Sequence, residues 1–165
     1  MLIEYDTSLV AVKIAKQKKI ETFVVFSSVN GLLGGSGLAA YSVANAFQHQ
    51  YCRFLQAKGD MSIYCIDWSG WYGTGISKTI PDNVVGLSQR SGFRFSNADE
   101  NLEYFDLVFE QGLHSAIAGL DREHKKVRAM TNDNYKAMLE VYYADQNDAI
   151  TRSVKGMEGV SLRYI

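Results

Sequence analysis

The sequence predicts an α/β fold in which helices flank a parallel sheet, and three observations predict it. First, residues 22–26 (TFVVF) and 62–68 (SIYCIDW) are short apolar runs rich in β-branched and aromatic residues, which is typical of strands buried on both faces. Second, residues 39–57 between these runs carry apolar side chains at helical spacing. Third, strand, helix and strand in this order form the unit of a right-handed parallel sheet.

The remaining elements follow from the same patterns. Residues 7–19 have an amphipathic pattern with a lysine-rich end, which favours a helix because cations stabilise the last turn. Residues 76–98 are polar and irregular and are expected to hold at most a short helix. We expect a helix at 101–113 and a strand at 113–120. A further helix is expected at 133–147, and the last 15 or so residues are expected to be loosely ordered.

Composition excludes several classes of function. The chain has 165 residues, 47% of them hydrophobic, and a net charge of −1, so it offers no basic excess that would attract nucleic acid or an anionic membrane. No apolar run approaches the roughly 20 residues that span a bilayer, and the acidic start does not resemble a secretory signal. Cys52 and Cys65 are expected to be free thiols in a reducing cytoplasm, and we expect no metal site.

Three polar residues carry the candidate chemistry. Ser28 follows the first apolar run, Tyr41 comes 13 residues later at the start of the predicted helix, and Asn45 follows after four more residues. Residues four apart share one helix face, and the four glycines between Val29 and Leu38 let that face turn toward Ser28. A phenol is protonated at neutral pH and is therefore able to act as a general acid. This pattern is typical of carbonyl reduction, in which a hydroxyl also stabilises the developing alkoxide.

Each of the three residues has a structural explanation as well. Tyr41 would suit an amphipathic core position, Asn45 a helix surface, and Ser28 a cap at the end of a strand. Spacing alone leaves both explanations open.

Longer stretches of the sequence resemble a known family. FVVFSSVNGLLGGSGLAAYSVANAF is similar to the active-site segment of ketoreductase domains from modular polyketide synthases and hybrid peptide–polyketide synthetases, members of the short-chain dehydrogenase/reductase superfamily. IDWSGWYGTGIS, SQRSGFRFSNADENLEYFDLVFEQG and HSAIAGLDREHKKVR resemble later segments of the same domain in the same order. The resemblance implies that residues 1–128 form the carboxyl-terminal strands and helices of a partial Rossmann-like sheet, and that residues 129–165 are an exit linker.

The resemblance also implies an activity. It makes Ser28 and Tyr41 the catalytic pair and places Asn45 where these ketoreductases have asparagine. It implies NADPH as the hydride donor, and as substrate a β-ketoacyl group on the phosphopantetheine arm of an acyl carrier protein. The remainder of a synthase is the other implied partner.

Further positions match the borders of the family's site. Ser69 and Gly70 match the turn beside the nicotinamide, and Trp71 and the segment 76–92, with Ile76 at its start, match the substrate lid. A loop turn, a core aromatic residue and a solvated loop explain these positions equally well. Leu33 stands where a tryptophan marks one stereochemical class, which argues against that class.

Two departures from the family pattern shape our expectation. The neighbourhood of the family's catalytic lysine holds Glu4, and the sequence contains no G-x-G-x-x-G fingerprint. We therefore expect a ketoreductase fragment that is inactive alone. A non-catalytic structural or interaction segment of a synthase is the first alternative, and another short-chain dehydrogenase is the second.

Overall fold

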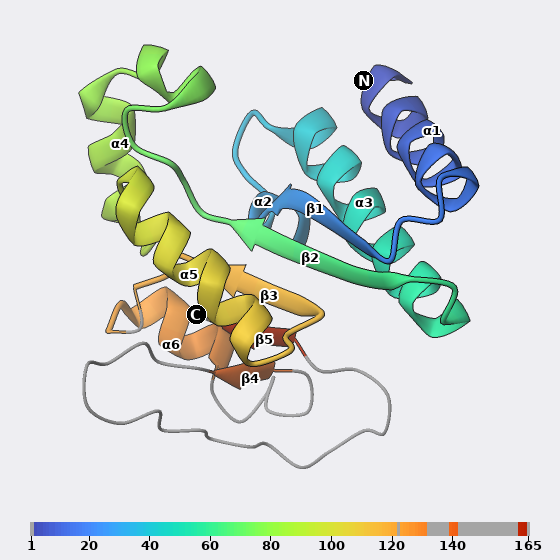
Figure 1. The fold of residues 1–165 in the computed structure, drawn as a ribbon. Helices are drawn as coiled ribbons and strands as arrows, with labels where there is room; N and C mark the ends of the chain where they lie inside the picture. Colours follow the sequence, from blue (N-terminus) through green and yellow to red (C-terminus); the bar gives the residue numbers. More distant parts are fainter. Residues whose placement is uncertain (1, 122, 132–138, 142–161, 165) are drawn as a thin grey trace. The chain divides into compact units, whose positions relative to one another are not determined.

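A computed structural model describes residues 2–121, 123–131, 139–141 and 162–164 (Figure 1). The chain divides into two compact units, Met1–Trp68 and Ser69–Ile165. None of the described helices combines the length and the apolarity that crossing a bilayer requires.

The first unit contains the predicted strand–helix–strand arrangement. Its elements are α1 (Leu2–Gln17), β1 (Thr22–Ser28), α2 (Asn30–Leu33), α3 (Ala39–Lys58) and β2 (Ser62–Trp68). The strands β1 and β2 are parallel, with Thr22 opposite Ser62 and Ser28 opposite Trp68. Helix α3 contacts both strands and α1 (Figure 1). The predicted α/β class is therefore confirmed.

Gly59 ends α3 in the left-handed conformation, with φ 71°, which glycine adopts without the steric cost of a side chain.

The core of this unit lies where α1, α3 and β2 meet. The buried core side chains are Val12, Ala15, Cys52, Leu55, Met61, Ile63 and Cys65. The apolar stripe on α3 and the alternate residues of β2 thus supply most of this core.

The prediction that residues 22–26 are fully buried is wrong. Thr22 is exposed, the middle of β1 is half-buried, and 52% of Phe26 is accessible to solvent. Within the described residues β1 has β2 as its one strand partner. An apolar run reports the tendency of residues to be buried, whereas actual burial depends on which neighbours cover both faces.

The described residues of the second unit form helices and three short strands. Its elements are η1 (Gly75–Thr79), α4 (Asp82–Gln89), α5 (Ala98–Glu110), β3 (Ser115–Ala118), α6 (Lys125–Thr131), β4 (Leu139–Val141) and β5 (Leu162–Tyr164). Strand β5 pairs in parallel with both β3 and β4. The short helix expected within 76–98 is present as α4.

Helix α5 begins three residues before the predicted start because Asn97 caps it. The Asn97 side chain accepts a hydrogen bond from the Glu100 N–H, and the Glu100 carboxylate accepts one from the Asn97 N–H, each at 3.0 Å. This reciprocal arrangement is a capping box.

Two predictions for the tail are wrong where the structure describes it. Residues 139–141 form a strand within the expected helix 133–147, and residues 162–164 form a strand within the expected loose end. The other residues of both segments lie outside the described part. Strands of three residues owe their conformation to partners distant in sequence, so local periodicity does not reveal them.

Candidate active site

Ser28 lies at the carboxyl end of the β1–β2 ladder. Its side chain is buried, and its hydroxyl oxygen accepts a hydrogen bond from the Asn30 N–H at 3.2 Å. A hydroxyl that accepts in this way keeps its own proton for donation. The carboxyl ends of parallel strands are also where ligands bind in sheets of this kind. Ser28 is therefore able both to cap the start of α2 and to donate to a bound oxygen.

Tyr41 is the third residue of α3. The loop before the helix turns at Gly34 and Gly37, whose φ angles are 71° and 74°, a region that residues with side chains rarely adopt. The exposed fraction of Tyr41 is 43%, so the alternative of a core tyrosine is wrong. The phenol is accessible, as a proton donor to a bound substrate must be.

Asn45 is buried, and its side chain bonds to the backbone of α3 one helical turn earlier. Its Nδ2 donates a hydrogen bond to the Tyr41 carbonyl oxygen at 2.8 Å. Only 6% of the residue is exposed, so the alternative of a helix-surface asparagine is also wrong. A buried amide without a hydrogen-bond partner is costly. The bond to the Tyr41 carbonyl oxygen therefore stabilises Asn45 in this buried position.

Ser27 is a residue of this site that the sequence did not single out. Its Oγ lies 3.3 Å from both the Oδ1 and the main-chain oxygen of Asn45. The bonds connect the end of β1, next to Ser28, to the helix that carries Tyr41. The pair of serines at the end of an apolar run was the available signal, since a buried hydroxyl needs a hydrogen-bond partner.

Gly31 determines how closely α2 approaches α3. A Cβ built on Gly31 would lie 2.8 Å from the main-chain carbon of Asn45 and from the main-chain nitrogen of Ala46. Only a residue without a side chain fits there. The backbone at Asn45 is thus positioned by direct contact with α2.

The three predicted catalytic residues therefore lie on elements of one unit that contact one another. Asn45 is hydrogen-bonded to Tyr41 and to the neighbour of Ser28. That the Ser28 hydroxyl and the Tyr41 phenol converge on one substrate oxygen stays a prediction. Leu33 ends α2 and is half-buried, and its relation to stereochemical class stays a prediction too.

The predicted nicotinamide turn lies in the second unit. The Ser69 N–H donates to the Ala118 carbonyl oxygen at 2.9 Å, and the Gly70 carbonyl oxygen accepts from the Ser96 N–H at 3.1 Å. A Cβ on Gly70 would lie 2.7 Å from the Phe95 ring. The turn is thus fixed on both sides and has no room for a side chain at its second residue.

The predicted lid residues follow directly. Trp71 is half-buried and forms a parallel bridge with Ser96, and its carbonyl oxygen accepts a hydrogen bond from the Ser77 hydroxyl. Ile76 lies in η1. These contacts connect Trp71 to the start of the 76–92 segment, and the lid function of both residues stays a prediction.

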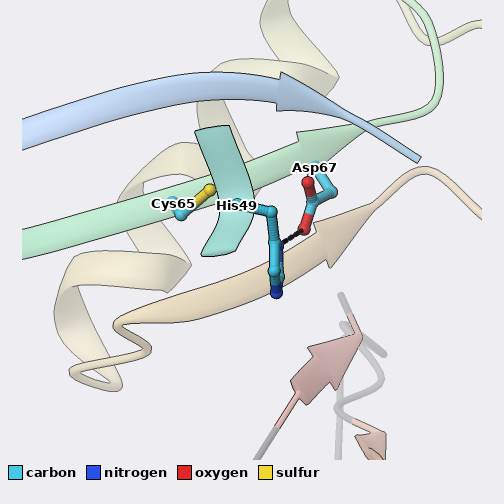
Figure 2. A group of neighbouring side chains, drawn as sticks. All are labelled: His49, Cys65 and Asp67. Carbon is cyan, nitrogen blue, oxygen red and sulfur yellow. Dashed lines mark hydrogen bonds and ion pairs between the residues drawn. The ribbon is translucent and has the colours of Figure 1, made fainter. Parts of the chain in front are cut away.

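A second buried polar group lies in the first unit. His49 of α3 and Asp67 of β2 are fully buried, and Figure 2 shows His49 Nδ1 facing Asp67 Oδ2, at a distance of 2.7 Å. Burial raises the pKa of the Asp67 carboxyl above its ordinary value of 3.8, and the hydrogen bond from His49 opposes this rise. The signal in the sequence was an aspartate inside an otherwise apolar strand.

Cys65 lies beside this pair, and the three side chains offer ligand atoms within 4.8 Å of one another (Figure 2). A hydrogen bond with Cys52 and burial hold the pKa of the Cys65 thiol well above its ordinary value. The His49–Asp67 hydrogen bond accounts for the way these two side chains face each other.

Comparison with known families assigns the first unit. Residues 6–73 match the family model of the KR domain. This match contains Ser27, Ser28, Tyr41, Asn45 and the whole β1–α3–β2 arrangement. Residues 6–73 are similar to a KR domain. We call this part of the chain the KR segment.

Relatives of the KR segment are synthases. The chain is 29% identical over 100 residues to a 6-methylsalicylic acid synthase of Arthrobotrys oligospora, and these residues are 61% of this chain and 6% of the relative. It is 38% identical over 93 residues (56% of this chain) to the 6-methylsalicylic acid synthase of Aspergillus niger. It is 25% identical over 118 residues (70% of this chain) to the polyketide synthase PksM of Bacillus subtilis. The chain spans 5% and 3% of the lengths of these last two relatives.

Solved structures show the same fold. The first ketoreductase of the tylosin polyketide synthase matches with a TM-score of 0.54 and 24% identity, over 63% of this chain and 22% of that one. A multidomain structure of a keto acid-selecting peptide synthetase module, which includes a ketoreductase, matches with a TM-score of 0.59 and 19% identity, over 87% of this chain and 13% of that one. The ketoreductase-like, Rossmann-type fold predicted from the sequence is thus confirmed.

Proposed function

We propose that the KR segment supplies the proton-donating half of a ketoreductase that converts a β-ketoacyl group into a β-hydroxyacyl group. The observation that carries the proposal is the position of Tyr41, an accessible phenol one helical turn before a buried asparagine that holds its backbone. The KR family match over the same residues supports it.

The chain's own residues would act as follows. Tyr41 donates its phenolic proton to the substrate oxygen as negative charge develops there, a contribution of typically about 10²–10⁴-fold for a general acid. Ser28 donates a hydrogen bond to the same oxygen, and loss of one such donor typically costs about 10²–10³-fold. Asn45 keeps the first turn of α3, and with it Tyr41, in place.

NADPH is the proposed cofactor and, when bound, supplies the hydride. One observation fits a cofactor at the Ser69–Gly70 turn. The Ser69 hydroxyl oxygen is buried and has no hydrogen-bond partner among the described residues. Ser69 and Gly70 would therefore border the nicotinamide, and Trp71 and Ile76 would cover the substrate.

The proposed partners are an acyl carrier protein that presents the β-ketoacyl group and the remainder of a synthase. This follows from the relatives, which are polyketide synthases many times longer than this chain. The two free, buried thiols suit a reducing compartment, and a cytoplasmic location stays a prediction.

A segment replacement tests the proposal. Residues 6–118 replace the corresponding segment of the tylosin ketoreductase, and NADPH oxidation is followed with a β-ketoacyl N-acetylcysteamine thioester. We expect Tyr41→Phe to lower kcat by about 10²–10⁴-fold and Ser28→Ala by about 10²–10³-fold. Tyr51→Phe removes a phenolic hydroxyl from the same helix, outside the proposed site, and is expected to leave kcat unchanged.

Two results would contradict the proposal. If Tyr41→Phe kept the turnover of the Tyr51→Phe control, Tyr41 would not be the acid. If the unchanged replacement protein folded and quenched its tryptophan fluorescence with NADPH but reduced no substrate, the segment would be structural and not catalytic.

A further inference from the structure

Ser27 is buried next to two other buried polar groups, Asn45 of α3 and the His49–Asp67 pair. We propose that Ser27 is a positioning residue: its hydroxyl donates to Asn45 and thereby holds the Asn45 side chain and the first turn of α3. This inference rests on the proposed function, because positioning matters for catalysis only if Tyr41 is the acid.

The first step is the contact between Ser27 and the buried pair. Ser27 stands directly opposite Asp67 in the parallel register of β1 and β2, so the two side chains leave the sheet on the same face. Asp67 is held by His49 Nδ1 at 2.7 Å, and neither residue is exposed. Ser27 therefore lies next to a buried polar group whose side chains are themselves held in place.

The second step is the contact between Ser27 and Asn45. The Ser27 Oγ is 3.3 Å from two oxygens of Asn45, the side-chain Oδ1 and the main-chain oxygen. A hydroxyl has one proton and donates it to one acceptor at a time. When that acceptor is Oδ1, the amide of Asn45 is oriented with Nδ2 turned away from Ser27.

The third step leads from Asn45 to the proposed acid. With Oδ1 facing Ser27, Nδ2 donates to the Tyr41 carbonyl oxygen at 2.8 Å. Without the Ser27 hydroxyl, the amide would lose the interaction that distinguishes its oxygen from its nitrogen. Leu38, at the start of α3, makes no side-chain cap hydrogen bond, whereas the Asn45 amide does bond to the first turn of the helix.

Nuclear magnetic resonance of the full 165-residue chain tests the inference without cofactor or substrate. In Ser27→Ala we expect the side-chain amide protons of Asn45 to exchange with solvent about three- to tenfold faster, which is the effect of losing one neutral hydrogen bond. The low-field Nδ1 proton of His49 is expected to remain, because its bond to Asp67 is intact.

Two variants serve as controls. Ser42 lies in the same turn of α3, and its hydroxyl has no hydrogen-bond partner among the described residues. Ser42→Ala is therefore expected to leave Asn45 exchange unchanged. Ser27→Thr keeps the hydroxyl and is expected to stay within about twofold of the unchanged chain, since threonine suits a strand. The inference would be overturned if Asn45 exchange were unchanged in Ser27→Ala, or if it rose equally in Ser42→Ala or Ser27→Thr. Loss of the His49 signal in Ser27→Ala would overturn it as well.

Kinetics of the segment-replacement ketoreductase separates this inference from the proposed function. We expect Ser27→Ala to lower kcat by about 10- to 100-fold with KM unchanged, because displacement of a catalytic group by about 1 Å has effects up to this size. If Tyr41→Phe has no effect on kcat, the proposed function fails whatever Ser27 does to Asn45. If Tyr41→Phe abolishes reduction but Ser27→Ala changes neither kcat nor Asn45 exchange, only the inference fails.

Discussion

Gly31 offers a sharp test of the packing that positions the candidate site. In Gly31→Ala the new Cβ would lie 2.8 Å from two main-chain atoms of α3 and 3.0 Å from the Asn45 Cβ, whereas ordinary contact begins at 3.4 Å. Main-chain atoms cannot rotate away as a flexible side chain can. The helices α2 and α3 must therefore separate by several tenths of an ångström.

The size of the effect follows from two opposing contributions. Forcing an extra methyl group into a packed contact typically costs about 1–3 kcal/mol, while replacing glycine by alanine within a helix contributes about 0.5–1 kcal/mol of stability. We expect a net loss of about 1–2 kcal/mol in the free energy of unfolding. Hydrogen exchange in residues 22–68, measured by mass spectrometry, should then accelerate about 5- to 30-fold.

Gly86→Ala is the matched control. Gly86 also lies in a helix, α4, but a Cβ there would meet no atom within 4 Å. We expect slower exchange around α4, corresponding to about 0.5–1 kcal/mol of added stability. The packing argument would be refuted if Gly31→Ala slowed exchange in residues 22–68 as Gly86→Ala does around α4.

Two further predictions concern surface electrostatics and capping. The Lys16 ammonium forms an ion pair with Asp60 and holds the pKa of that carboxyl below its ordinary value of 3.8. The ion pair therefore stabilises the fold above pH 3.8, and this contribution is lost as the pH falls through the lowered pKa. An NMR titration should show the Asp60 pKa rising toward 3.8 in Lys16→Met, and an unchanged pKa would exclude Lys16 as the cause. Asn97→Ala removes the side-chain oxygen that accepts from the Glu100 N–H, while the backbone N–H of residue 97 is kept, and it should destabilise α5 by about 1 kcal/mol in urea unfolding. Glu103→Ala, on the exposed face of the same helix, should have an effect within about 0.5 kcal/mol, and equal effects of the two variants would contradict the capping argument.

Local patterns in the sequence were sufficient for the elements of the first unit. The run SIYCIDW forms β2 at the predicted residues 62–68, and α3 spans Ala39–Lys58 against a prediction of 39–57. Both signals are local, because helical spacing and glycine termination act within a few turns. The stretch around Ser28, Tyr41 and Asn45 was equally readable, since the resemblance it carries is confirmed by the KR family match.

The tertiary structure alone decided which polar groups meet. Ser27 contacts Asn45 across 18 residues, and His49 contacts Asp67 across another 18, so no local pattern could pair them. In the sequence Gly31 is one of several loop glycines, and only its close approach to the α3 backbone explains why a glycine is required there. The strands at 139–141 and 162–164 were hidden for the same physical reason: hydrogen bonds to distant partners stabilise them, and a window of neighbouring residues carries no information about those partners.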